Sequence, residues 1–307
     1  MSYRALHGPL RLAPAGLALA TLALLPTAAR AQAAPVPAAI APEAQTLAVA
    51  DSARPVAPTA LTPAVRPTAP QAAADEDLAP DRPGFTTGPS LLRRGRRQVE
   101  TGYSFSRAGS ERDHALGEVL VRAGVTSGVE LRVGLNSFEF ASGADGRASG
   151  MDDATIAAKV RLLSGGDGPS FRPDAALIAG TSLPSGGRAF GRHRAEPEAT
   201  LSAAWTTPHE TSLTVNLGAA DRDAGAGATV AEYASGAAFA WALGARVGSY
   251  VEYSTSWTGE PGSAQRYVNT GLTFVPGHVL QIDAWTAVGV HRGGPDYSLG
   301  LGLVRRW

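Results

Sequence analysis

The sequence LGLGLVRRW, residues 299–307 at the C-terminus, alternates apolar side chains with small or polar ones. Tyr297, Leu299, Leu301 and Leu303 share one parity, and the residues between them are serine or glycine. Because successive side chains of a strand point to opposite faces, a period of two predicts a β-strand. One face of this strand is expected to meet an apolar environment and the other a polar one.

The N-terminal residues 1–31 have the three parts of a secretory signal peptide. Two arginines lie among the first eleven residues, the apolar run LALATLALL occupies residues 17–25, and Ala-Arg-Ala follows at residues 29–31. The apolar run is too short to cross about 30 Å of hydrocarbon as a helix. We therefore expect export, with cleavage after Ala31 or Ala33.

The composition argues against several classes of protein. The chain has no cysteine, so it cannot form disulfides, a thiolate metal site or a cysteine nucleophile. Its 27 basic and 27 acidic residues balance, and this neutrality gives no indication of a nucleic-acid partner. The 36 glycines favour β-structure with many turns over helix.

From Arg97 to Trp307 the chain divides into segments of strand length. In one segment Val129, Leu131, Val133 and Leu135 alternate with polar or small residues. The twelve predicted strands are residues 97–107, 114–124, 128–138, 152–163, 173–184, 194–206, 210–220, 229–243, 246–258, 264–275, 278–291 and 296–307.

The connections between these segments alternate between short and long. Outer-membrane barrels have tight periplasmic turns, longer external loops and strands of about ten residues. The strands of a soluble β-sandwich also alternate between apolar and polar residues, and the charged residues would fit its solvated face. A sandwich, however, has no reason to place short and long loops at opposite ends. We predict an all-β fold, a closed antiparallel up-and-down transmembrane β-barrel of twelve strands at residues 97–307, because lipid cannot satisfy an open sheet edge.

An even number of strands returns both ends of the barrel to the periplasmic side. We expect the protein in the outer membrane of a Gram-negative-type bacterium, with outer-membrane lipid as its surroundings and its N-terminus in the periplasm. Residues 32–76, almost entirely Ala, Pro, Val and Thr, are predicted to be a disordered periplasmic spacer. Residues 77–96 are either a plain lead-in or a plug that folds back into the periplasmic mouth.

Four stretches resemble, in the same order, a family of outer-membrane β-barrels associated with meta-pathway phenol degradation and commonly called transporters. They are DRPGFTTGPSLLRRGRRQVETGYSFS at 81–106, VLVRAGVTSGVELRVGL at 119–135, SGMDDATIAAKVRLL at 149–163 and AGTSLPSGG at 179–187. The resemblance implies uptake of small, often aromatic molecules. Gly84 stands where the family usually has an acid. Trp307 replaces the usual terminal phenylalanine but remains aromatic, so recognition of the last strand by the barrel-assembly machinery is expected to persist.

The parity of three neighbouring strands points Tyr250, Tyr267 and Trp285 into the lumen at similar heights. Three aromatic rings in a polar tube predict a site on which an aromatic solute stacks. The alternative is that a lumen of twelve strands is narrow and bulky side chains simply fill it.

Charged side chains also point inward. They are either a field that selects solutes or cross-strand pairs that hold the barrel together, and the pattern favours the structural role. These lumen charges are Glu100, Glu130, Arg132, Lys159, Arg161, Glu252 and Asp283.

The sequence predicts no covalent chemistry. No serine stands in a nucleophile motif, and the histidines of the mature chain, at or beside strand ends and turns, lack metal-ligand spacing. We expect no catalytic residue, no metal and no cofactor, hence no enzyme. The predicted function is a channel through which small hydrophobic or aromatic solutes diffuse passively; the alternative is a structural or adhesive barrel with a closed lumen and partner-binding loops.

Overall fold

The computed structural model describes residues 78–144, 146–165, 170–192, 194–209, 211–225, 228–290 and 295–307. The predicted signal peptide and spacer lie outside the described residues. No helix in the described part of the chain is long and apolar enough to cross a membrane. The strands found there are β1 (Arg97–Ala108), β2 (Glu111–Gly124), β3 (Val129–Gly143), β4 (Gly146–Met151), β5 (Thr155–Leu163), β6 (Asp174–Ser182), β7 (Glu196–Thr207), β8 (Thr211–Gly225), β9 (Ala228–Ala242), β10 (Val247–Thr258), β11 (Gln265–Gly277), β12 (Leu280–Gly289) and β13 (Tyr297–Arg306).

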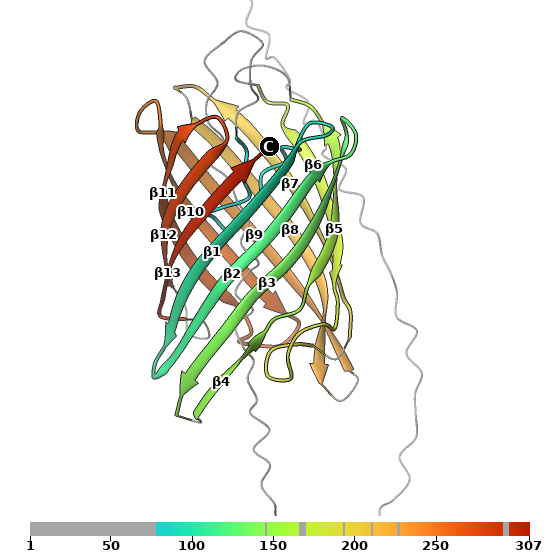
Figure 1. Ribbon diagram of the computed structural model, residues 1–307, viewed down its shortest axis with the longest axis vertical. Helices are drawn as coiled ribbons and strands as arrows, with labels where there is room; N and C mark the ends of the chain where they lie inside the picture. Colours follow the sequence, from blue (N-terminus) through green and yellow to red (C-terminus); the bar gives the residue numbers. More distant parts are fainter. Residues whose placement is uncertain are drawn as a thin grey trace, which may run out of the picture. The chain divides into compact units, whose positions relative to one another are not determined.

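The strands close into an antiparallel barrel (Figure 1). Apart from β4, each strand pairs with the strands before and after it along the chain, and β1 pairs with β13 from Gln98 opposite Arg306 to Arg107 opposite Tyr297. Twelve strands form the wall, as predicted, and β4 is an additional short strand that pairs only with the end of β3. We call the end with Arg97 and Trp307 the turn end and the opposite end, which contains β4, the loop end.

Two of the long connections predicted from the sequence are largely strand. Residues 139–143 form the end of β3 and residues 146–151 form β4, with Ser142 opposite Arg147. The connection after residue 220 likewise continues the β8–β9 ladder, with Arg222 opposite Val230. Cross-strand hydrogen bonds satisfy the backbone N–H and C=O groups outside the membrane as well as within it, so a hairpin can extend beyond the apolar band. Side chains there need not alternate between apolar and polar, and for this reason the sequence pattern did not predict these strand ends.

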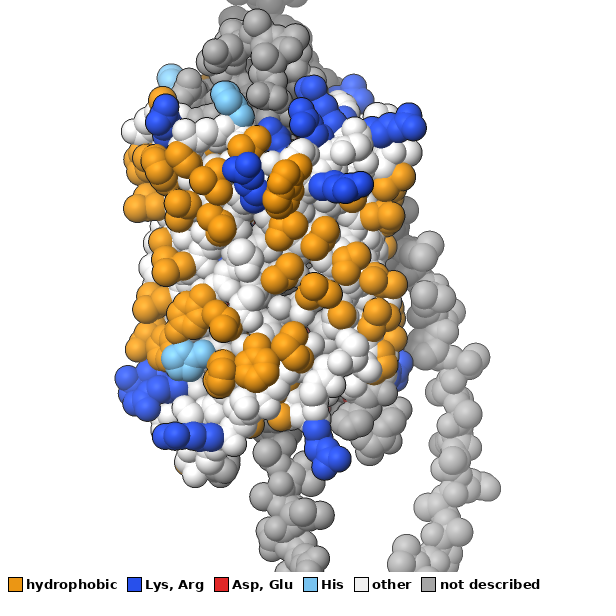
Figure 2. Space-filling model, viewed as in Figure 1, with side chains coloured by type: hydrophobic (Ala, Val, Ile, Leu, Met, Phe, Trp, Pro, Cys, Tyr) orange, Lys and Arg blue, Asp and Glu red, His pale blue; other side chains and the backbone are white. Residues whose placement is uncertain are grey.

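The two faces of the barrel wall are as predicted, apolar outside and polar inside. Leu131, Leu217 and Leu301 are 50%, 57% and 60% exposed, whereas Glu130 and Asn269 are fully buried. Figure 2 shows hydrophobic side chains across one face, with Lys and Arg side chains toward both ends and no acidic side chain in view. A soluble β-sandwich would have the opposite arrangement, with a dry apolar interior.

A bulge explains why β2 alternates poorly in the sequence. Gly117 and Glu118 have φ values of +107° and +42°, and the β1–β2 register shifts beside them. The extra residue lets Leu116 point outward, 55% exposed, while Glu118 contacts a residue inside the barrel. Leu116 and Glu118 therefore face opposite sides although their parity is the same.

Aromatic rings of the outer face pair near both ends of the barrel. Phe105 lies 6.0 Å from Tyr297 toward the loop end, where Tyr233 and Trp257 also stack. Phe239 and Trp241 lie 6.0 Å apart toward the turn end. Such rings are typical of the two interfaces of a membrane.

Candidate functional site: the lumen and the segment inside it

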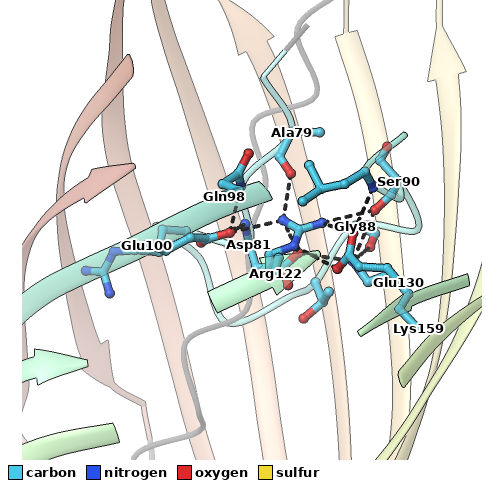
Figure 3. Close-up of polar contacts among 12 residues, drawn as sticks. Ala79, Asp81, Gly88, Ser90, Gln98, Glu100, Arg122, Glu130 and Lys159 are labelled. Carbon is cyan, nitrogen blue, oxygen red and sulfur yellow. Dashed lines mark hydrogen bonds and ion pairs between the residues drawn. The ribbon is translucent and has the colours of Figure 1, made fainter. Parts of the chain in front are cut away.

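We call residues 78–96 the inner segment; its residues 78–92 lie inside the barrel, and residues 93–96 are exposed at the turn end. Almost every residue from Leu78 to Leu92 is buried. The inner segment contacts side chains or backbone of β1, β2, β3, β5, β7, β8, β10, β12 and β13. Figure 3 shows it within the ring of strands.

Asp81 is the centre of a buried ionic cluster (Figure 3). Its Oδ1 lies 3.1 Å from Lys159 Nζ and 3.4 Å from Arg122 Nη1, and its Oδ2 pairs with Arg132. Burial alone would raise the pKa of the Asp81 carboxyl, but the positive charges of Arg122, Arg132 and Lys159 outweigh it and hold that pKa well below its usual range. Asp81 is therefore ionised at neutral pH.

The barrel wall supplies two more carboxylates to this cluster. Arg122 pairs with Glu100 at 3.0 Å and with Glu130 at 2.8 Å. The wall thus provides three cations but only two anions, and Asp81 brings the balance to zero. Removing one partner from a buried ion pair typically costs about 3–5 kcal/mol. The excess positive charge of the wall therefore holds the inner segment in place through the Asp81 carboxylate.

Arg82 brings a positive charge to carboxylates of β2 and β12. Its Nη1 pairs with Glu118 at 2.8 Å, its Nε lies 3.7 Å from Asp283, and its Nη2 donates to the Leu301 carbonyl at 3.1 Å. A Cβ at Gly102 or Gly302, which face each other across β1 and β13, would overlap this guanidinium. The two glycines therefore form the recess that admits Arg82.

Phe85, Thr86 and Thr87 are held by hydrogen bonds. Glu252 accepts the Phe85 N–H at 2.7 Å and the Thr86 hydroxyl. The Thr87 N–H donates to Asn216 Oδ1 at 2.6 Å, and the Thr87 carbonyl accepts from the Asn216 side chain and from the Ser202 hydroxyl. No ion pair joins residues 85–87 to the wall among the described contacts.

The predicted lumen charges divide among these contacts. Glu100, Glu130, Arg132 and Lys159 gather around Asp81, Asp283 faces Arg82, and Glu252 binds residues 85–87. Arg161 joins none of them and is exposed near the turn end. The predicted lumen charges did not include Arg122, although its inward parity was readable from the sequence.

The three predicted aromatic residues point inward but not at one height. Tyr250, Gly271, Trp285 and Gly300 form a single row across β10 to β13, and each ring leans over a neighbouring glycine. Tyr267 lies four residues nearer the loop end on β11. Phe85 of the inner segment joins them, with its ring centroid 6.0 Å from Tyr267 and 5.7 Å from Trp285 in edge-on geometry. Each such pair contributes about 0.5–1.5 kcal/mol.

Gly124 at the end of β2 allows the backbone of the inner segment to pass. A Cβ there would lie 2.5 Å from the Leu92 carbonyl oxygen and 2.6 Å from the Arg93 carbonyl carbon. Gly124→Val is expected to lower the free energy of unfolding by about 1–3 kcal/mol through overpacking, measured by denaturant titration in micelles. Gly244→Val is the control, because Gly244 has open space around it. Equal losses in both variants would contradict this account.

The described residues contain no group of three His, Cys, Asp or Glu side chains that could hold a metal ion. His114, at the loop end, accepts or donates a hydrogen bond with the Tyr103 hydroxyl at 2.8 Å and contacts the Phe105 ring. It therefore belongs to the aromatic belt. His193 and His291 lie outside the described residues.

Comparison with known proteins gives a family and a fold. Residues 80–307 match the family described as "Putative MetA-pathway of phenol degradation". An outer membrane channel from Pseudomonas putida F1 is similar at 15% identity and a TM-score of 0.58, over 71% of this chain and 97% of that one. The NanC porin is similar at 9% identity and a TM-score of 0.47, over 68% of this chain and 98% of that one. No curated protein matches the chain.

Proposed function

The chain belongs to the MetA-pathway phenol-degradation family of outer-membrane β-barrels, and we propose that it is a channel for small hydrophobic or aromatic solutes. One observation carries the proposal: Tyr267 and Trp285 present their rings to the lumen, and an aromatic ring already lies against both. A solute of one ring would make the same contacts. The role is transport without covalent chemistry.

We propose that the turn end faces the periplasm. The orientation is supported by the position of Arg97 and Trp307 at that end, since an exported chain with an N-terminal spacer begins on the periplasmic side. In this orientation the inner segment enters from the periplasm and acts as a plug. Trp307 would then lie where the barrel-assembly machinery meets the last strand.

The rival function is a closed structural or adhesive barrel, and the buried inner segment favours it. The two functions differ in what happens when solute is present. A channel must move the inner segment at least in part, whereas a closed barrel keeps it in place. Solute binding in the lumen is the first requirement.

Phenol is expected to quench tryptophan fluorescence of the purified protein in micelles with a saturable component. This component should vanish in Trp285→Phe and persist in Trp257→Phe, because Trp257 lies on the outer face. Tyr267→Ala keeps the reporter and should weaken the affinity about two- to tenfold, as one ring contact is lost. A linear, unsaturable response in the unmodified protein would refute the proposed site.

A further inference from the structure

Phe85 differs from its neighbours in the inner segment. Every other residue from Asp81 to Pro89 is buried, whereas Phe85 is half-buried. Its ring therefore lies at the surface of the inner segment, against Tyr267 and Trp285, which belong to β11 and β12. A solute that reached these two rings would meet the place that Phe85 occupies.

We propose that Phe85 is a tethered ligand: it occupies the aromatic site of the lumen, and an aromatic solute binds there by displacing it. This proposal rests on the proposed function and adds that binding a solute and opening part of the plug are one event. The intramolecular ring keeps the site filled when solute is absent.

The inner segment is built so that residues 85–87 can move while the rest stays. Gly84 and Gly88 bracket Phe85-Thr86-Thr87, and glycine tolerates backbone conformations that other residues do not. Residues 85–87 are held by ring contacts and hydrogen bonds, which water or a solute can replace. Asp81 and Arg82 are held by buried ion pairs, whose separation leaves charges unpaired.

Glu252 indicates which aromatic solutes fit best. Its carboxylate accepts from Phe85 N–H, from the Thr86 hydroxyl and, at 3.0 Å, from Asn269 Nδ2. Displacement of residues 85–87 removes two of these donors, and a buried carboxylate requires replacements. A ring that carries a hydrogen-bond donor, such as a phenolic hydroxyl, supplies one.

The first test compares two ring truncations. Phe85→Ala removes the competitor, so its affinity for phenol, measured by the saturable quenching of Trp285, should rise by about tenfold or more. Tyr267→Ala removes a wall of the site and should lower the affinity. Phe171→Ala, which truncates a fully exposed phenylalanine, should change nothing. If Phe85→Ala binds phenol with unchanged or lower affinity, Phe85 is not a competitor.

The second test uses the absence of native cysteine. Thr87→Cys and Leu92→Cys each place one thiol in a buried part of the inner segment, at positions 0% and 3% exposed. With saturating phenol, maleimide labelling of the first should accelerate about tenfold or more, while labelling of the second stays slow. If phenol accelerates the labelling of both variants, the whole inner segment leaves the lumen. If it accelerates the labelling of neither variant, the segment does not move. Either result overturns the proposal.

The outcomes separate this proposal from the proposed function. If no variant shows saturable quenching, both fall. If the unmodified protein binds phenol and Phe85→Ala binds it no better, the aromatic site stands and the tethered ligand falls.

Discussion

Asp81→Asn is expected to release the inner segment from the lumen. The substitution keeps the shape of the side chain but removes its charge, leaving Arg122, Arg132 and Lys159 with only Glu100 and Glu130. The loss of one partner from a buried ionic cluster costs about 3–5 kcal/mol, which shifts the balance between docked and released segment by more than about a hundredfold. In planar bilayers this should appear as a large rise in single-channel open probability.

A second substitution tests whether charge balance is the cause. Lys159→Met in the Asp81→Asn background removes one cation and returns the cluster to two positive and two negative charges. The open probability of the double variant should return much of the way to that of the unmodified protein. The free-energy effects of the two single substitutions would then not add, and the difference is their coupling energy. Asp174→Asn, at an exposed carboxylate near the turn end, should leave the conductance unchanged. A closed channel in Asp81→Asn would mean that the Asp81 charge does not hold the segment.

Leu301→Arg is expected to destabilise the barrel in a lipid bilayer. Leu301 lies in the middle of β13 and is 60% exposed on the apolar outer face. An arginine on the lipid face near the midplane costs about 2–4 kcal/mol. Denaturant unfolding in liposomes, followed by tryptophan fluorescence, measures this loss.

The control for this variant conserves volume. Leu301→Met should cost less than about 1.5 kcal/mol, because the side chain remains apolar and of similar size. If Leu301→Arg is as stable as the unmodified protein, this face does not meet lipid, and the assignment of the outer surface is wrong.

The barrel was predictable from the amino-acid sequence alone. Twelve segments of strand length, most with a period of two, loops sorted by length and an apolar face in the C-terminal strand together favour a closed sheet between lipid and water over a soluble sandwich. Parity also assigned inward positions correctly for Glu130, Lys159, Tyr250 and Trp285. Alternation failed at Leu116 and Glu118 because a bulge places these two residues on opposite faces. In the sequence, the one extra residue of a bulge is visible only as a break in the alternation.

The contacts of the inward side chains, in contrast, could not be predicted and follow from the folded arrangement of the strands. The side chains of Arg122, Arg132 and Lys159 come from three different strands and meet at Asp81, which precedes the barrel in the chain. Such contacts depend on the register and tilt of strands far apart in sequence, whereas alternation reports only the direction of each side chain. For the same reason the sequence predicted an aromatic trio but not the fourth ring, Phe85, that lies against two of its members.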